Sequence, residues 1–161
     1  MVFAENVMND PNDNVRLSFV SYGKFFETLV TDTSIRVRRA VAEYLVNDTK
    51  CSTTFTAEEC NKYLDILVRD ESLEIQRIIA KFGYGLDVLI NSNDHEILRL
   101  VASHGYGLDV LVNHPHQDVR CAVAKQRYGL DILIADPNAS VRFTAEVQLK
   151  KMKLEAESKK Q

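Results

Sequence analysis

Residues 83–90 are Gly-Tyr-Gly-Leu-Asp-Val-Leu-Ile, and almost the same stretch returns twice further along the chain. Residues 105–112 are Gly-Tyr-Gly-Leu-Asp-Val-Leu-Val, and residues 127–134 are Arg-Tyr-Gly-Leu-Asp-Ile-Leu-Ile. Each copy begins 22 residues after the one before it. A fixed period of this length is typical of stacked supersecondary units, in which each unit buries its apolar side against its neighbours. The repeat therefore decides the fold class before any single residue is considered.

The same period extends through most of the chain. A β-branched residue marks position 15 of six units, at Val15, Val37, Ile75, Ile97, Val119 and Val141. These residues define units 1–22, 23–44, 61–82, 83–104, 105–126 and 127–148, with an insertion at 45–60 and a tail at 149–161. Glycine and proline support this register, because all six glycines fall at position 1 or 3 and all three prolines at position 11.

Each unit carries the signals of two helices. Position 10 is most often aspartate, which caps helix N-termini, and proline follows it in three units. This pattern predicts a helix from position 11 to about position 21, with positions 15 and 19 buried. Glycine at position 1 ends that helix, and apolar residues at positions 4, 7 and 8 predict a shorter helix of one and a half to two turns. We therefore expect an all-α protein, a right-handed α-solenoid of six two-helix repeats forming one domain over residues 1–161.

The unit pattern Leu-Asp-x-Leu-x-x-Asp-Pro-x-x-x-Val-Arg-x-x-x-Ala, seen most clearly around residues 131–142, resembles the leucine-rich repeat variant and HEAT-like families. The Tyr-Gly-Leu-Asp motif is also similar to repeat proteins of bacterial and phage origin. This resemblance covers residues 1–44 and 61–148 and implies an α-solenoid. One leucine-rich repeat variant protein carries an iron–sulfur module, but the cysteine cluster that would hold it is missing here, so we expect no cofactor. HEAT-like DNA glycosylases have a basic concave face, whereas this chain has an acidic balance and no Trp.

Composition narrows the class of protein. The net charge is −3 and the isoelectric point about 5.8, which argues against broad affinity for nucleic acid or anionic membranes. We expect no signal peptide, and no apolar run approaches the length of a membrane-spanning helix. Cys51, Cys60 and Cys121 are too few for a disulfide scaffold. Cys51 and Cys60 share the insertion and could meet, but free thiols and a cytoplasmic location are the expectation.

An arginine column occupies position 16, at Arg16, Arg38, Arg120 and Arg142, and is interrupted by Gln76 and Leu98. One interpretation is a stripe that binds phosphate. The favoured interpretation is structural, with each arginine hydrogen-bonded to the capping aspartate of a neighbouring turn. The pairs expected on this basis are Arg38 with Asp10 or Asp32, and Arg142 with Asp136 or His114.

An acidic column occupies position 5, at Glu5, Glu27, Asp65, Asp87, Asp109 and Asp131. A carboxylate in the first turn of the short helix is favourable near the positive end of the helix, and this is the favoured interpretation. The functional alternative is a row of carboxylates offered to a basic protein surface. Such a row could also imitate a nucleic-acid backbone, although the repeat spacing of about 10 Å exceeds the interval between phosphates.

The insertion and the tail depart from the repeat. Phe55 lies in a Ser/Thr-rich stretch and is a candidate anchor for a partner, although a tolerated loop is the favoured interpretation. Thr56-Ala-Glu-Glu resembles a capping box, which predicts a helix from Ala57. The tail, 149–161, should continue the preceding helix as a polar cap, with a basic interaction tail as the alternative. His114 and His116 are expected to point apart, because Pro115 should start a helix between them, so no metal site is predicted.

These features favour a binding protein over an enzyme. No nucleophile–base arrangement, phosphate loop or metal motif is present in the sequence. The leading hypothesis is a non-enzymatic module or adaptor that binds another protein through an extended solenoid face. The alternatives are an inhibitor of the phage or mobile-element type, which would occlude a nucleic-acid-handling enzyme as anti-CRISPR proteins do, and a HEAT-like nucleic-acid binder. The N-terminal repeat edge could also support self-association.

Overall fold

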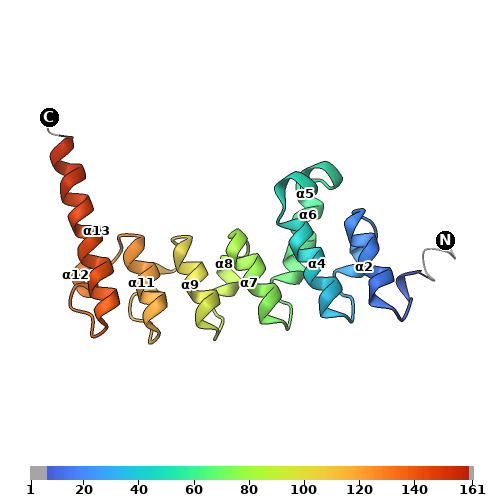
Figure 1. Cartoon of the computed structure of the whole chain (residues 1–161), viewed down its shortest axis with the longest axis horizontal. Coiled ribbons are helices and arrows are strands. Elements are labelled where there is room, and N and C mark those ends of the chain that lie inside the picture. The colour runs from blue at the N-terminus through green and yellow to red at the C-terminus, as the bar shows by residue number, and fades with distance from the viewer. Residues whose placement is uncertain (1–6, 160–161) are drawn as a thin grey trace. The chain divides into compact units, whose positions relative to one another are not determined.

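The computed structural model describes residues 7–159, apart from the side chains of residues 48–50, and over that range it contains twelve helices and no strand (Figure 1). The protein is therefore all-α, as the sequence predicts. The chain divides into two compact units, Met1–Gly85 and Leu86–Gln161. One continuous domain over all 161 residues stays a prediction.

The unit Met1–Gly85 contains six described helices. In order, they are α2 (Asp13–Ser21), α3 (Phe26–Leu29), α4 (Ile35–Leu45), α5 (Asp48–Thr54), α6 (Ala57–Leu67) and α7 (Leu73–Phe82). The helix predicted from Ala57 is confirmed: the Thr56 side chain accepts a hydrogen bond from the Glu59 backbone N–H, and the Glu59 carboxylate accepts one from the Thr56 backbone N–H. Without this capping box, two backbone N–H groups at the N-terminus of α6 would lack a hydrogen-bond partner.

The unit Leu86–Gln161 alternates one-turn helices with longer ones. The order is α8 (Leu86–Leu89), α9 (His95–Ser103), α10 (Leu108–Leu111), α11 (Gln117–Lys125), α12 (Leu130–Leu133) and α13 (Ala139–Ser158). Both kinds of helix recur every 22 residues, and α11 packs between α9 and α13 (Figure 1). Positions 15 and 19 are buried as predicted, with no exposed surface at Ile97, Val101, Val119, Val123, Val141 and Ala145. The short helices are one turn of four residues, shorter than expected.

The longer helices begin two residues later than the sequence pattern indicates. Each begins at position 13, as α11 does at Gln117, and not at position 11, so the prolines precede the helices. The predicted cap at position 10 is therefore wrong. The position-10 side chain instead accepts a hydrogen bond from the backbone N–H two residues on, such as Asn138 N to Asp136 Oδ1 at 2.8 Å. The residue at position 12 then caps the helix, as Asn138 does for α13.

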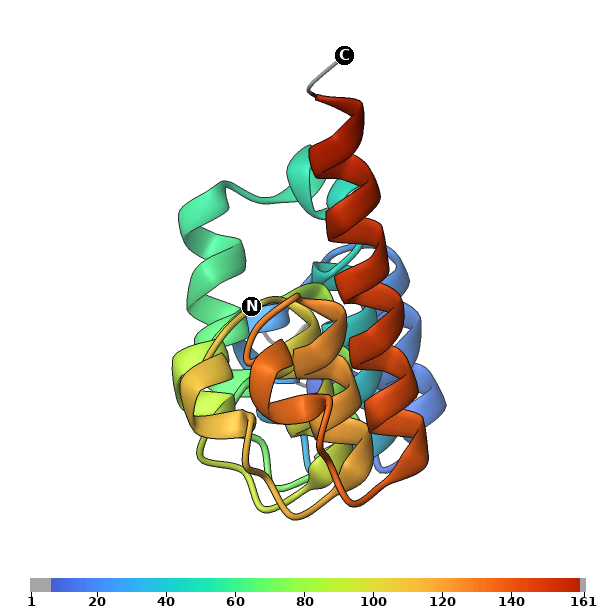
Figure 2. The same cartoon turned by 90° about the vertical axis from the view of Figure 1, so that its left-hand side faces the viewer.

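The tail continues α13 as predicted, and this half of the helix is exposed. Every residue from 150 to 159 is exposed, and Figure 2 shows α13 extending beyond α11 and α12 of its own unit. A bidentate ion pair from Arg127 to Glu155, at 2.6 and 2.7 Å, ties this half to the turn before α12. The capping role of residues 149–161 stays a prediction.

Cys51 and Cys60 form a disulfide that joins α5 to α6. The expectation of free thiols at these two positions is therefore wrong, while Cys121 is free. The physical reason is that α5 is a helix where the sequence suggested a loop, and the α5–α6 arrangement brings the two Cα atoms to 6.7 Å. That separation lies within the range that a disulfide requires.

A glycine at position 3 of the repeat lets consecutive turns pack closely. Gly107 has φ +61°, and a Cβ built on it would lie 2.6 Å from Ile90 Cδ1. Gly129 has φ +57°, and its Cβ would lie 2.6 Å from Val112 Cγ2. Because L-residues disfavour this left-handed conformation, both the backbone and the contact favour glycine. The start of α10 thus lies against Ile90, which follows α8, and the start of α12 lies against Val112, which follows α10.

We expect Gly107→Ala to destabilise the protein more than Gly105→Ala, as measured by urea denaturation. Both residues have positive φ, so each substitution carries about 1–2 kcal/mol of backbone strain. At Gly105 the nearest atom to the added Cβ is Gln126 Oε1 at 4.0 Å, so no clash adds to the strain. At Gly107 overpacking against Ile90 adds about 1–3 kcal/mol. Adding Ile90→Ala to Gly107→Ala should remove the overpacking cost. Equal losses of unfolding free energy for Gly105→Ala and Gly107→Ala would contradict the close contact between Gly107 and Ile90.

Candidate functional site

Three of the four arginines in the arginine column, Arg16, Arg38 and Arg120, bind carboxylates within the fold. Arg120 donates from Nε and Nη2 to Asp136 Oδ2 and Oδ1, at 2.6 and 2.9 Å, and from Nη1 to the His114 carbonyl at 2.7 Å. Arg16 makes the same contacts with the Asp32 carboxylate and the Asp10 carbonyl, and Arg38 with the Asp70 carboxylate and the Asp32 carbonyl. Guanidiniums engaged on both edges in this way are not available to bind phosphate.

The pairs expected for Arg38 and Arg142 need correction. The carboxylate on Arg38 comes from Asp70, in the following unit, and Asp32 supplies only its carbonyl oxygen. Arg142 likewise bonds to the Asp136 carbonyl at 2.7 Å and not to its carboxylate. The reason is directional: the position-16 side chain crosses its own turn and then reaches forward, so its own unit offers backbone oxygen and the next unit offers the carboxylate.

The buried carboxylates are held ionised by these contacts. In Asp136 the hydrogen bond from Arg120 is the largest influence and lowers the pKa below its usual value. In Asp32 burial acts most strongly and opposes ionisation, but hydrogen bonds from Arg16 and the Ser34 N–H outweigh it, so the pKa is also lowered. A carboxyl whose folded-state pKa is lowered stabilises the fold at neutral pH and loses that contribution as pH falls through the folded pKa, below about 3.9.

The sequence pairs these columns one unit apart. Where position 16 is arginine, as in Arg16, Arg38 and Arg120, position 10 of the following unit is aspartate. Where it is Gln76 or Leu98, position 10 of the following unit is Ser92 or His114. His114 accepts a hydrogen bond at Nδ1 from the His116 N–H, and burial lowers its pKa. Position 10 therefore carries a buried carboxylate only when a guanidinium reaches it.

The acidic column is exposed wherever the structure describes it, and Glu5 lies outside the described residues. Glu27 lies in α3. Asp65 differs from the others, because it sits in the last turn of α6 and accepts a 2.7 Å hydrogen bond from the Tyr84 hydroxyl. Asp87, Asp109 and Asp131 lie in the first turns of α8, α10 and α12. Within residues 7–159 these three carboxylates have no ion pair or side-chain hydrogen bond.

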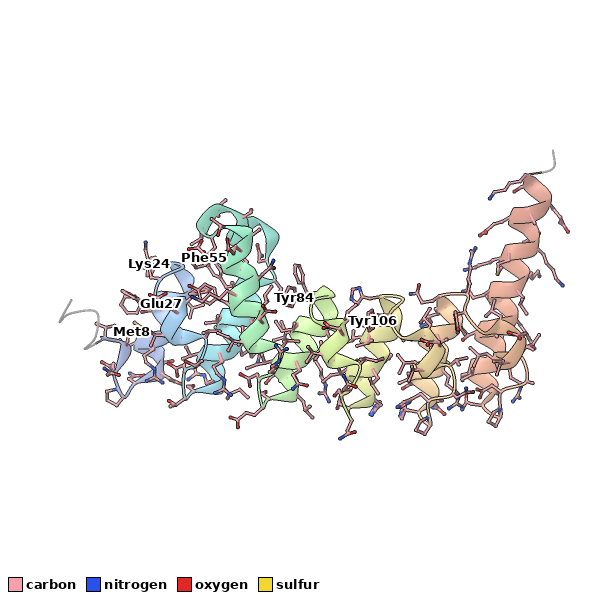
Figure 3. All side chains as sticks on the ribbon, turned by 180° about the vertical axis from the view of Figure 1, so that it is seen from behind. Met8, Lys24, Glu27, Phe55, Tyr84 and Tyr106 are labelled. Carbon is pink, nitrogen blue, oxygen red and sulfur yellow. A yellow bond between two sulfur atoms is a disulfide. The ribbon has the colours of Figure 1, made fainter. Side chains whose placement is uncertain are left out.

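Exposed apolar side chains stand beside Asp109 and Asp131, whereas Val88, beside Asp87, is half-buried. A four-residue helix can turn only its first and last residues inward, as α12 does with Leu130 and Leu133, so the two between them face solvent. Val110 is 66% exposed and Ile132 52% exposed, next to Asp109 and Asp131. Tyr106 and Tyr128, just before α10 and α12, are also exposed, and Figure 3 shows Tyr106 projecting from the ribbon. We name Asp87, Tyr106, Asp109, Val110, Tyr128, Asp131 and Ile132 the acidic–apolar surface.

The members of this surface lie on adjacent turns. The close approaches of Gly107 to Ile90 and of Gly129 to Val112 place the start of α10 against the end of α8, and the start of α12 against the end of α10. Sequence analysis found the carboxylates but missed their apolar neighbours. The signal was present, because positions 4, 6, 7 and 8 are all apolar and one turn of helix cannot bury four such residues.

Phe55 belongs to an aromatic cluster in the unit Met1–Gly85. Its ring centroid lies 4.9 Å from that of Phe26, 5.7 Å from Tyr63 and 6.3 Å from Tyr44. Phe55 is half-buried and lines a hollow of about 720 Å³ together with Leu45, Leu64, Phe82 and the two bonded cysteines. Figure 3 labels Phe55 together with Glu27 of α3. The role of Phe55 as a partner anchor stays a prediction.

His116 lies against another histidine, from α9. Pro115 lies before α11 and does not start it, and the His116 ring stacks on that of His95 of α9, with 3.8 Å between ring centroids. Over the described part of the chain, no group of three or more His, Cys, Asp or Glu side chains is placed to hold a metal ion. Among the helices of residues 7–159, none combines the length and apolar character needed to cross a membrane.

Comparisons of this chain with protein-family models, with curated proteins and with solved structures give no match. Its functional assignment therefore depends on the surfaces described above.

Proposed function

We propose that this protein is a non-enzymatic interaction module that binds another protein, and that its six units form a right-handed α-solenoid of the HEAT-like or leucine-rich repeat variant kind. One observation carries the functional proposal. Among the described residues, Asp87, Asp109 and Asp131 are exposed carboxylates without a partner. Exposed Val110 and Ile132 stand next to the last two, with exposed Tyr106 and Tyr128 just before α10 and α12. Exposed apolar groups of this kind mark interaction surfaces, and the charge selects the partner's sign.

The partner that fits is a protein surface with basic and aliphatic side chains. Lysine or arginine would face Asp87, Asp109 and Asp131, while apolar side chains would cover Val110 and Ile132. The tyrosines suit an interface, because each offers a large rigid ring and a hydroxyl at low entropic cost. Arg16, Arg38 and Arg120 contribute to folding and not to this contact, since their guanidiniums are already engaged by Asp32, Asp70 and Asp136.

Charge reversal tests the proposal. The triple variant Asp87→Lys, Asp109→Lys, Asp131→Lys and the wild-type chain would each be used to capture partners from the native host. We expect a protein retained by wild type and lost by the variant. Titration of that purified protein should show affinity for wild type that falls as salt rises. The matched control is Glu58→Lys, Asp118→Lys, Glu157→Lys, which changes the net charge equally at exposed positions elsewhere.

Two outcomes would overturn the proposal. Binding that survives the triple substitution with unchanged salt dependence would show that the acidic–apolar surface is not used. Equal loss in the control variant would show a response to net charge alone.

The runner-up function uses the same surface. A row of carboxylates could occupy the nucleic-acid site of an enzyme, as the inhibitor hypothesis requires, and competition between this protein and the enzyme's nucleic acid would identify that case. A HEAT-like nucleic-acid binder is disfavoured because the exposed column is acidic. Binding of single- or double-stranded DNA in a gel shift at low salt would reverse that ranking.

The cytoplasmic location also stays a proposal. The disulfide between Cys51 and Cys60 weighs against it, because reducing compartments keep thiols free.

A further inference from the structure

Arg142 is arranged like the other members of its column but lacks their carboxylate. Its Nη1 donates to the carbonyls of Asp136 and Pro137, at 2.7 and 3.0 Å. Arg120 is held in the same way by the carbonyls of His114 and Pro115, at 2.7 and 2.9 Å. In Arg120 the remaining edge, Nε and Nη2, binds Asp136. Among the described residues, nothing accepts from the same edge of Arg142.

Asp10 is the complementary half of such a pair. Its Oδ1 accepts from the Asn12 N–H at 2.8 Å, just as Asp32 accepts from Ser34 and Asp136 from Asn138. In Asp32 and Asp136 the carboxylate also receives two hydrogen bonds from an arginine. Within residues 7–159, no arginine reaches the Asp10 carboxylate. Both half-sites are therefore held in the geometry that three pairs of the same chain use.

The surroundings of Arg142 are those of an uncovered junction. Ile134 is 41% exposed, whereas its counterparts at position 8, Val68 and Val112, are buried against the following turn. Phe143 is 67% exposed. Its counterpart one repeat earlier, Cys121 of α11, lies against Thr144 of α13. An arginine and two apolar side chains thus share the face of α12 and α13 that is turned away from α11.

The surroundings of Asp10 match that face. Elsewhere in the chain, positions 14, 18 and 22 meet the preceding unit, as Arg36 meets Asp13, Thr144 meets Cys121 and Gln126 meets the Ser103 carbonyl. In α2 and its C-cap the same positions are Asn14, Ser18 and Tyr22, all exposed. This face is polar apart from the Tyr22 ring, and its Asp10 carboxylate suits an arginine.

We propose that a second copy of this chain docks its Asp10 face on the Arg142 face, with Asp10 accepting both hydrogen bonds from Nε and Nη2 of Arg142. The contact is heterologous, since different surfaces of the two copies meet. It is independent of the acidic–apolar surface, so either proposal can fail without the other. Exposed Glu146, near Arg142 on α13, would lie beside the hydroxyls of the docked α2.

The test is the mass of the full chain in solution, measured by sedimentation velocity over a range of protein concentrations. Wild type is expected to associate with rising concentration and less so at high salt. Asp10→Arg leaves two arginines to face each other across the contact, and Arg142→Asp leaves two aspartates. Each variant alone should associate at least about 30-fold more weakly, the effect of removing a partner from a charge pair at an interface.

Mixing the two variants is the decisive arm, because their unchanged faces are complementary. Arg142 of the Asp10→Arg chain can bind Asp10 of the Arg142→Asp chain, so the mixture should form a dimer that neither variant forms alone. Recovery on mixing also shows that each variant is folded. A wild-type chain that stays monomeric at every concentration would overturn the proposal, as would association that neither substitution weakens.

Discussion

Arg120→Met is expected to lower the free energy of unfolding by about 3–5 kcal/mol, because it leaves the Asp136 carboxylate buried without its partner. The Asp136 side chain is 4% exposed and receives two hydrogen bonds from Arg120, at 2.6 and 2.9 Å. Methionine keeps much of the side-chain volume, so the loss reports on charge and hydrogen bonding more than on packing. Urea denaturation followed by far-UV circular dichroism measures the change at neutral pH.

The matched control copies a pair that the chain already contains. Leu98 and His114 occupy the positions equivalent to Arg120 and Asp136 one unit earlier. The double variant Arg120→Leu, Asp136→His should therefore recover most of the stability, since replacing both partners removes the unpaired charge. Lowering the pH should reduce the difference in unfolding free energy between wild type and Arg120→Met, because a protonated Asp136 carries no charge that requires a buried partner. A cost of less than about 1 kcal/mol for Arg120→Met would contradict the role assigned to the pair.

Phe26→Ala is expected to cost about 3–5 kcal/mol of unfolding free energy, the typical effect of truncating a buried phenylalanine. Phe26 has no exposed surface, and its ring meets those of Phe55, Tyr44 and Tyr63 at centroid distances of 4.9, 5.0 and 6.0 Å. Truncation would leave a cavity between α3, α4 and the α5–α6 insertion. Thermal or urea denaturation of the purified variant provides the measurement.

Leu154→Ala is the control for that truncation. Leu154 is 56% exposed on the outer half of α13, so its loss should change stability by no more than about 0.5 kcal/mol. If Phe26→Ala and Leu154→Ala were equally stable, the aromatic cluster would not be part of the core of Met1–Gly85.

Sequence reasoning succeeded where one unit determines the structure. The 22-residue period predicted the all-helical class and the burial of positions 15 and 19, which holds in every repeat but the first, where Val15 and Phe19 are half-buried. The Thr56-Ala-Glu-Glu motif predicted the start of α6 at Ala57. Sequence reasoning failed at the starts of the longer helices, because aspartate followed by proline is equally suited to a turn before a helix and to the helix start itself. Only the hydrogen bond that the position-12 N–H donates to the position-10 side chain distinguishes the turn from the helix start.

Glycine also shows the limit of local rules. The left-handed conformation recurs at position 3 in Gly85, Gly107 and Gly129, but also in Phe25, and at position 1 in Arg127. The conformation therefore follows from the repeat geometry, and glycine is the residue that adopts it with least strain. Phe25 is accommodated beside Phe19, with ring centroids 5.5 Å apart.

Contacts between units depended on the fold. The arginine and acidic columns were both visible in the sequence, but their roles could not be separated there, because a charged column is compatible with burial or exposure. The structure pairs Arg16, Arg38 and Arg120 with carboxylates one repeat ahead. It leaves Asp87, Asp109 and Asp131 in solvent, the last two next to exposed Val110 and Ile132. The disulfide also depended on the fold, since it required α5 to form and to bring Cys51 close to Cys60 of α6.

The sequence by itself determined the period, the helical class and the face of each longer helix that is buried, because these follow from propensity and spacing within 22 residues. Tertiary structure alone decided which charges are neutralised, which apolar side chains stay exposed and which two half-sites, Asp10 and Arg142, remain open. Those outcomes depend on the direction in which each side chain crosses to its neighbour, and no pattern within a single unit specifies that direction.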